Sequence, residues 1–269
     1  MKFGLKGLLA IAAVASALVL SGCGEKQADT SKIKVGVMAG AEAQVAEVAA
    51  KVAKEKYGLD VELVTFTDYV TPNAALDDGS IDINAFQHKP YLDQQVTDRG
   101  YKLTIAGNTF VYPIAGYSKQ VKSVDEIQDG ARIAVPNDPT NLGRSLLLLE
   151  QQGLLKLRDD VGLLATVRDI TENPKNITIV ELDAAQLPRS LDDVALSIIN
   201  TTYASSIDLT PQKDGVFVED KESPYVNLIV AREDNVKAEN VQNFVKSYQT
   251  DEVYTAASDI FKGGVVKGW

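Results

Sequence analysis

The sequence predicts an α/β fold in two lobes, with a ligand cleft between them. Strand-like apolar runs alternate with amphipathic helical stretches over residues 32–117, and the alternation resumes at Arg132. That order is typical of mainly parallel sheets flanked by helices. Because no low-complexity linker separates the two runs, we expect the chain to cross between the lobes on strands. Such crossings form a hinge, which allows the lobes to close on a ligand.

The first run is the more regular of the two. Apolar residues alternate over 32–38, which predicts a strand, and recur at helical spacing over 41–57, up to Gly58. The elements expected next are a strand over 60–66, a short helix over 71–79, a strand over 81–85, a helix that ends at Arg99, and strands over 103–106 and 110–117.

The second run carries shorter elements. Ser123 and Glu126 fit a capping box for a short helix that Gly130 stops. We expect strands over 132–135, 177–182, 194–199 and 225–231, and helices over 142–152, 201–207, 241–248 and 252–261. The last strand and helices return to the first lobe, so the first lobe is expected at 32–111 with 227–269 and the second at 112–226.

The N-terminal segment predicts export and a lipid anchor. Residues 1–22 combine a basic start with an apolar run too short to span a bilayer comfortably, as signal peptides do. Leu20-Ser21-Gly22-Cys23 resembles a bacterial lipobox, which would place a lipid on Cys23; a plain secretory signal with a chance cysteine is the alternative. Residues 23–31 are polar and form a tether. We therefore expect a soluble body, anchored by lipid to a membrane and facing the periplasm.

Composition argues against several function classes. The formal charge of -10 and the pI of about 4.7 argue against nucleic acid as a partner. Cys23 is the only cysteine and His88 the only histidine. The sequence therefore lacks the set of Cys and His ligands that a metal site needs, and it offers no partner for a catalytic dyad. The nucleophile motif G-x-S-x-G is absent from the sequence. We expect no metal and no cofactor.

One candidate site begins where the predicted strand over 81–85 ends. Phe86 and His88 point to one side of an extended chain, Pro90 suits the first position of a helix, and Tyr91 follows in its first turn. The carboxyl ends of strands in α/β sheets bind ligands, so this stretch is expected to form one wall of a small-molecule site. Taken alone, His88 favours a structural hydrogen-bonding role, and its place between Phe86 and Tyr91 makes a pocket role equally expected.

The other candidates lie apart in the sequence. Tyr69 and Tyr112 fall in turns or at strand ends, and suit either a pocket or the core. Arg144, at the start of a predicted helix, either binds an anion together with the free N–H groups of that helix or is solvated. Asn200 and Asn227 end or interrupt apolar strands, where a buried amide either accepts from an ammonium group or braces the backbone.

Several motifs are long and unusual. They are Ile33-Lys34-Val35-Gly36-Val37, Asn84-Ala85-Phe86-Gln87-His88-Lys89-Pro90-Tyr91-Leu92, Asn108-Thr109-Phe110-Val111-Tyr112-Pro113, Val135-Pro136-Asn137-Asp138-Pro139-Thr140-Asn141-Leu142-Gly143-Arg144 and Ser223-Pro224-Tyr225-Val226-Asn227. With them the chain resembles the methionine-binding lipoproteins of the MetQ/NlpA family, the substrate-binding components of methionine ABC importers. The resemblance runs from the lipobox to Lys267-Gly268-Trp269.

That resemblance implies a type II-like periplasmic-binding-protein fold with methionine in the interlobe cleft. It implies that Arg144 and Asn141 bind the α-carboxylate, and that Asn200 and Asn227 hold the ammonium. The thioether pocket would be lined by Tyr69, Phe86, His88, Tyr91 and Tyr112. The protein would deliver methionine, without catalysis, to an ABC permease and its ATPase in the inner membrane, and we expect a monomer.

One segment departs from the family pattern, and three other functions remain open. Residues 192–200 look a residue or two shorter than usual, and we expect the shortening in the loop before the strand, because a slip within it would reverse its side chains. The alternatives are another apolar amino acid as ligand, an exported hydrolase of amino-acid derivatives, and a surface adhesin. A hydrolase would need a nucleophile–base pair, and an adhesin would need no arginine and aromatic residues converging on a cleft.

Overall fold

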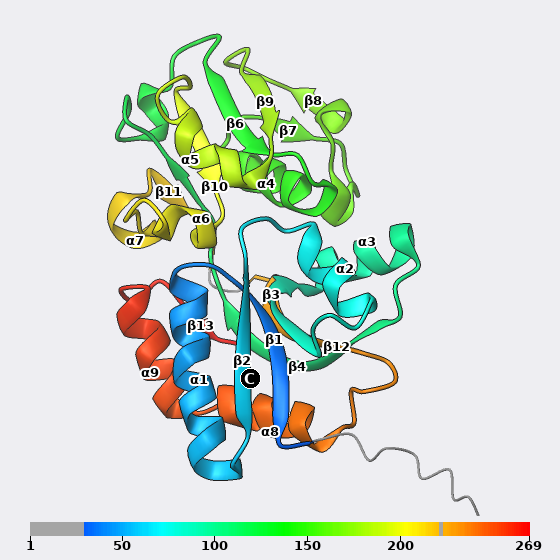
Figure 1. Ribbon diagram of the computed structural model, residues 1–269. Coiled ribbons are helices and arrows are strands. Elements are labelled where there is room, and N and C mark those ends of the chain that lie inside the picture. The colour runs from blue at the N-terminus through cyan, green and yellow to red at the C-terminus, as the bar shows by residue number, and fades with distance from the viewer. Residues whose placement is uncertain (1–29, 221–222) are drawn as a thin grey trace, which may run out of the picture.

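A computed structural model of the chain describes residues 30–220 and 223–269. Residues 1–29, with the predicted signal peptide, Cys23 and most of the tether, lie outside the described residues. The α/β prediction is confirmed, because a six-stranded and a five-stranded sheet each carry helices and form separate lobes (Figure 1). No helix within the described ranges is long and apolar enough to cross a membrane.

The first lobe contains the six-stranded sheet, in the order β13-β4-β12-β3-β1-β2. Its strands are β1 (Lys32–Met38), β2 (Asp60–Phe66), β3 (Ile83–His88), β4 (Leu103–Val111), β12 (Val226–Arg232) and β13 (Val266–Lys267). Its helices are α1 (Ala41–Tyr57), α2 (Thr71–Asp77), α3 (Lys89–Arg99), α8 (Glu239–Tyr248) and α9 (Asp251–Ile260). The first four strands point in one direction, whereas β12 and β13 run opposite to them. The prediction of a mainly parallel sheet is wrong for this lobe: the returning strand β12 is inserted between β3 and β4, so three of the five strand pairings are antiparallel and the sheet is mixed.

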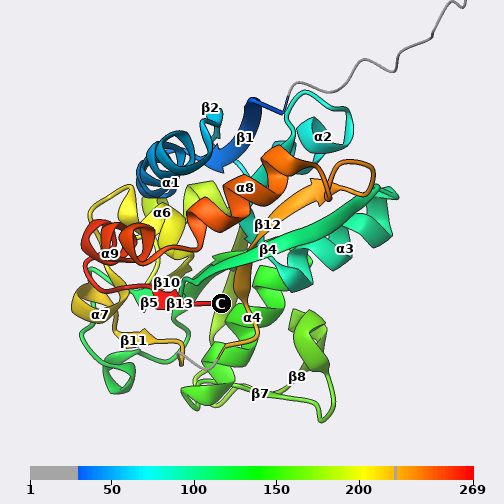
Figure 2. The ribbon, with the colours of Figure 1, turned by 90° about the horizontal axis from the view of Figure 1, so that it is seen from below.

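Both faces of this sheet are covered by helices. α1, α8 and α9 lie together on one face (Figure 2), where Val45, Phe244 and Val253 are fully buried. α2 and α3 cover the other face, with Leu76 and Leu92 buried against the strands. Each large apolar side chain buried in this way stabilises the fold by roughly 1.5–3 kcal/mol. β3 is therefore buried at every residue, and its carboxyl end is held firmly in place.

The second lobe contains the five-stranded sheet, in the order β11-β5-β10-β6-β9. Its strands are β5 (Ala115–Tyr117), β6 (Arg132–Pro136), β9 (Thr178–Leu182), β10 (Leu196–Ile199) and β11 (Phe217–Val218), with β7 (Lys156–Leu157) and β8 (Ile170–Glu172) as a separate pair. Its α-helices are α4 (Pro139–Gln151), α5 (Leu187–Ser190), α6 (Thr201–Ser205) and α7 (Pro211–Asp214). Its 3-10 turns are η1 (Val124–Glu126), η2 (Gly162–Leu164), η3 (Val167–Asp169) and η4 (Ala184–Gln186). Only β5 opposes the common strand direction of this sheet.

The chain passes between the two sheets twice. The first crossing joins β4 to β5, and the prediction of one strand over 110–117 is wrong, because Pro113 has no N–H to donate to a ladder. The second crossing joins β11 to β12. The two crossings touch, since the Glu219 N–H donates to the Ile114 carbonyl at 2.9 Å. We propose residues 32–111 with 227–269 and residues 112–226 as the two lobes.

Other boundaries also differ from the sequence prediction, most of them by one to three residues, and two cases have a clear physical cause. β3 runs to His88 instead of ending at residue 85, because β12 continues the ladder by pairing Asn227 with His88. The predicted capping box at Ser123 is wrong. The Ser123 side chain makes no cap, Glu126 instead accepts from the Lys122 N–H at 2.8 Å, and the helix is a single 3-10 turn.

Candidate functional site

A cavity with about 360 Å³ of empty space lies between the lobes. Its lining residues are Tyr69, Phe86, Gln87, His88, Tyr91, Tyr112, Asn141, Arg144, Asn200, Thr201, Thr202 and Asn227. The structure therefore brings together all nine residues that the sequence singled out. The first lobe supplies Tyr69 from the turn before α2, Phe86, His88 and Tyr91 from the end of β3 and the start of α3, and Asn227 from the start of β12. Tyr112 lies in the crossing between β4 and β5, and the second lobe supplies Asn141 and Arg144 from α4 and Asn200 from the junction of β10 with α6.

Three aromatic rings from the first lobe form one wall of this cavity. The ring centroids of Tyr69, Phe86 and Tyr91 lie 6.0 to 6.3 Å apart in tilted and edge-on pairs. The Tyr91 hydroxyl donates to the Tyr69 carbonyl at 2.7 Å, so its polar end is satisfied by protein. Tyr203 of α6 closes on Tyr69 at 5.0 Å from the other lobe. Such a wall suits a slender apolar or sulfur-containing chain.

His88 caps helix α3 with its own ring. The Tyr91 backbone N–H donates to His88 Nδ1 at 3.2 Å, so the ring proton belongs on Nε2, which faces Asn141 Oδ1 at 3.3 Å. Burial, and then the positive charge of Arg144, lower the pKa of His88 to about 3. The imidazole is therefore neutral and structural, and it cannot take up a proton without losing its cap.

Asn141 connects the two halves of the site. Its Oδ1 accepts from Asn200 Nδ2 at 2.9 Å as well as facing His88, while its Nδ2 donates to both carboxylate oxygens of Asp138. Both ends of this amide are thus occupied by protein groups. Asn141 is placed to orient His88 and Asn200, and its side chain has little capacity left for a ligand carboxylate.

Asn200 presents an unsatisfied acceptor. It is 7% exposed, and its Oδ1 has no hydrogen-bond partner among the described residues. Buried amide oxygens are normally paired, so this one marks a place where a ligand donor fits. Asn227 lines the cavity from β12, and its Nδ2 donates to the Phe86 carbonyl at 3.0 Å.

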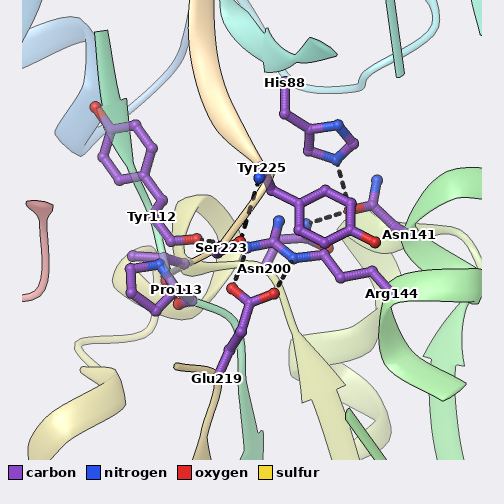
Figure 3. A network of polar contacts seen from close by, with 10 residues as sticks. His88, Tyr112, Pro113, Asn141, Arg144, Asn200, Glu219, Ser223 and Tyr225 are labelled. Carbon is purple, nitrogen blue, oxygen red and sulfur yellow. Dashed lines mark hydrogen bonds and ion pairs between the residues drawn. The ribbon is translucent and has the colours of Figure 1, made fainter. Parts of the chain in front are cut away.

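Arg144 is the only lysine or arginine in the lining, and it is 3% exposed. Nε and Nη2 of its guanidinium donate to the two carboxylate oxygens of Glu219 at 2.8 and 2.5 Å, and Nη2 also donates to the Tyr112 carbonyl at 3.1 Å. The Tyr225 ring lies over the guanidinium, with its centroid 4.2 Å from Cζ (Figure 3). Nη1 makes no hydrogen bond to the part of the chain that the structure describes. The Nε–Nη2 edge of the guanidinium is therefore occupied by Glu219, and Nη1 is the group left for a ligand.

The predicted helix start beside Arg144 is wrong. α4 begins at Pro139, three residues before the predicted start, because Asp138 caps it by accepting from the Asn141 N–H at 2.9 Å. Arg144 thus lies in the second turn, and the first turn is already covered by a carboxylate. The helix N-terminus and the guanidinium do not form a joint anion site.

Some site residues had no signal of their own in the sequence. Gln87, Thr201 and Thr202 complete the lining, and each lies within two residues of a predicted residue. Glu219 and Tyr225 hold Arg144 without lining the cavity. Tyr112 lines it, yet its ring packs into the first-lobe core with Phe110 and Phe261, at 6.1 and 5.0 Å.

Metal binding has no support in these ranges. Across residues 30–220 and 223–269, no group of three or more His, Cys, Asp or Glu side chains is arranged to hold an ion.

Comparison with known proteins places this chain in a family. The sequence model of the NlpA lipoproteins matches residues 33–269. The chain belongs to the NlpA lipoprotein family. Its resemblance to that family, read from the motifs, is therefore confirmed. Within the family, the chain is 84% identical to the probable D-methionine-binding lipoprotein MetQ of Vibrio cholerae, with both chains fully covered.

Solved structures of NlpA-type proteins share the fold. A crystal structure of the methionine binding protein MetQ matches with a TM-score of 0.89 and 74% identity, covering 90% of this chain and 99% of the other. A nutrient binding protein from Burkholderia cenocepacia bound to methionine matches with a TM-score of 0.86 and 51% identity, covering 88% and 100%. The predicted two-lobed periplasmic-binding-protein fold is confirmed.

Proposed function

We propose that the protein captures methionine in the interlobe cavity, as the substrate-binding component of an ABC importer. The family membership and the methionine-binding relatives support this function. Capture proceeds without catalysis, because both ring nitrogens of His88 are engaged by Asn141 and by the Tyr91 N–H, and neither of these partners is a nucleophile. The cargo passes to a membrane permease and its ATPase, and a lipid on Cys23 keeps the monomeric protein beside the membrane, facing the periplasm.

The observation that carries this proposal is the unpartnered Oδ1 of Asn200. A buried acceptor next to a buried arginine offers one group for an ammonium and one for a carboxylate. An α-amino acid presents these two groups on neighbouring atoms. Asn227 adds a second amide beside the ammonium position, and Nη1 of Arg144 donates to the carboxylate.

The aromatic wall accounts for the choice of side chain. The rings of Phe86, Tyr69 and Tyr91 require an apolar side chain on the ligand. A sulfur atom at the edge of an aromatic ring is favourable by about 0.3–1.5 kcal/mol per contact. A small amino acid such as alanine would leave this wall uncovered. The same argument makes methionine a better ligand than other apolar amino acids that lack a polarisable sulfur.

Isothermal titration calorimetry of the full-length protein in detergent tests the proposal. We expect the wild-type protein to bind methionine much more tightly than alanine. The L and D enantiomers of methionine are titrated separately. Arg144→Ala should weaken methionine binding roughly 30-fold or more, because a charge-assisted contact is lost and Glu219 is left buried without its partner. Arg158→Ala, which removes an exposed arginine paired with Asp169, should leave affinity unchanged. Absence of methionine binding by the folded wild-type protein would exclude the proposed function.

A further inference from the structure

We propose that Glu219 sets the charge preference of the cavity. By pairing with Arg144 it balances the charge of the guanidinium, so that the site selects a zwitterion and rejects a ligand with a net negative charge. This inference rests on the proposed function, and it names a residue outside the cavity lining as a determinant of specificity.

The contact between the two side chains is close and shielded from water. Both carboxylate oxygens of Glu219 accept from the guanidinium, and the side chains of Arg144 and Glu219 are 3% and 10% exposed. Charge pairs so poorly solvated are screened little by salt. Breaking one by removing a partner leaves an uncompensated charge in a site of low dielectric constant. The pair therefore acts as a fixed, neutral unit at the edge of the cavity.

No other lining residue contributes a formal charge at neutral pH. His88 is neutral, because its Nδ1 accepts the Tyr91 N–H. Asp138 lies outside the lining and directs its carboxylate to the first turn of α4 and to the Asn141 amide. Glu42 lies behind Thr202, and burial raises the pKa of its carboxyl to about 8, so it is mostly protonated at neutral pH.

A ligand therefore meets a guanidinium whose charge is already balanced. A zwitterion placed against Nη1 and Asn200 Oδ1 adds no net charge to the site, because its ammonium offsets its carboxylate. An anion of the same shape would add a second carboxylate beside a single arginine. Repulsion from Glu219 would then oppose the attraction of Arg144 in a medium that screens charges weakly. Discrimination of this kind works by penalising the wrong ligand as well as by binding the right one.

A purely structural role for Glu219 makes a different prediction. If Glu219 only holds the guanidinium in place, changing it should weaken every ligand that contacts Arg144 by a similar factor. A change in charge should instead alter the ratio of two affinities. Two variants separate these cases. Glu219→Gln removes the charge and nearly keeps the shape of the side chain, whereas Glu219→Asp keeps the charge and shortens the side chain.

The test uses the full-length protein, calorimetry and two probes, methionine and its 2-hydroxy analogue, in which a hydroxyl replaces the ammonium. The analogue is a monoanion, yet its hydroxyl can still donate to Asn200 Oδ1. We expect the wild-type protein to prefer methionine by more than about tenfold, and Glu219→Gln to reduce this preference by about tenfold or more. Glu219→Asp should keep the wild-type preference within about threefold, even if both affinities fall.

Several results would overturn the inference. An unchanged ratio in Glu219→Gln would make Glu219 a scaffold for Arg144 only. An equal shift in both variants would point to geometry and not to charge. Should Glu219→Gln fail to fold, a wild-type protein that binds both probes within about threefold would decide against the inference by itself. A folded wild-type protein that binds neither probe overturns the proposed function as well, and this distinguishes the two failures.

Discussion

The imidazole of His88 shows how one backbone hydrogen bond decides the chemistry of a side chain. Its Nδ1 is used as the cap of α3, and its Nε2–H points at Asn141. Protonation would require a second proton on Nδ1, next to the guanidinium of Arg144 and away from water. The residue type that most often exchanges protons near neutral pH is therefore fixed in its neutral form.

We expect the His88 imidazole to show no titration between pH 5 and pH 8. Its pKa of about 3 lies below the ordinary value of 6.5, so its contribution to stability is present above pH 6.5 and is lost as the pH falls toward 3. Because His88 is the only histidine, NMR of the ring nitrogens follows it directly, and should show the Nε2–H tautomer. The protein unfolded in urea serves as the control, with a midpoint near 6.5. A midpoint near 6.5 in the folded protein would contradict the assigned cap.

Most residues that line the cavity could be predicted from the sequence, but their hydrogen-bonding partners could not. Phe86 and His88 lie at the end of a buried strand and Tyr91 in the first turn of the helix after it, and a local pattern places such residues together. The partner of Arg144 is 75 residues away, at Glu219, and no periodicity connects them. The family resemblance implies that Asn141 binds the ligand carboxylate, yet its amide holds His88 and Asn200. Roles of this kind depend on tertiary geometry that single residues do not encode.

At the scale of elements, helix α4 positions the second-lobe half of the site through one close approach. Gly143, one residue before Arg144, faces the end of η2 and the residue after it. A Cβ at Gly143 would lie 2.2 Å from the Leu163 carbonyl oxygen and 3.0 Å from the Ala165 nitrogen. Both are backbone atoms, so neither can move aside without shifting the segment. The glycine therefore sets how closely α4 packs against residues 163–165.

We expect Gly143→Ala to destabilise the protein by about 1–3 kcal/mol, as overpacking does in other cores. Helix propensity alone predicts the opposite sign, since alanine favours a helix interior by about 1 kcal/mol over glycine. Urea unfolding measures which effect is larger. Ser145→Ala on the same helix is the matched control, because it removes a buried hydroxyl without a partner and should be neutral or stabilising. A Gly143→Ala protein as stable as the control would show that the contact is loose.

Element length decides how well the sequence predicts the fold. The first strand, first helix and second strand match at every boundary, because seven or more residues carry a clear period. The sequence does not predict β7, β11 and β13, because a two-residue strand has no periodic pattern and is defined only by its hydrogen bonds to a neighbouring strand. β3 was placed early for the same reason: its last residues are in a strand because β12 lies beside them.

At the scale of the whole molecule, the lobes meet through buried polar contacts around the cavity. Asn141 faces His88, the Tyr203 hydroxyl donates to the Thr67 carbonyl at 3.2 Å, and Thr202 Oγ1 donates to Glu42 Oε1. Each contact joins one lobe to the other. Those made by Asn141 and Thr202 involve cavity-lining residues, so a ligand that orders the lining also orders the junction between the lobes. The sequence predicted two lobes from the missing linker, but nothing in it marked these contacts.

Glu42 makes this junction sensitive to pH. Glu42 lies in the first turn of α1 and is 3% exposed. The titratable side chains around its carboxyl are tyrosines, which are neutral at neutral pH, namely Tyr69, Tyr112, Tyr203 and Tyr248. Burial raises its pKa from 4.5 to about 8, and the hydrogen bond from Thr202 only partly opposes this. The folded protein thus keeps a proton that the unfolded chain releases. The contribution to stability is full below pH 4.5 and is lost as the pH rises through about 8.

Replacing this carboxyl should therefore flatten the pH dependence of stability. We expect Glu42→Gln to match the wild-type protein near pH 4.5 and to become more stable than it as the pH rises to 8, by roughly 3–5 kcal/mol at most. Glu47→Gln is the control on the exposed side of the same helix, and its curve should run parallel to that of the wild-type protein. Urea unfolding at intervals of pH measures the difference. Parallel curves for Glu42→Gln and the wild-type protein would mean that the carboxyl is ionised in the fold, in which case the lobes are joined by a charged hydrogen bond to Thr202 and not by a neutral one.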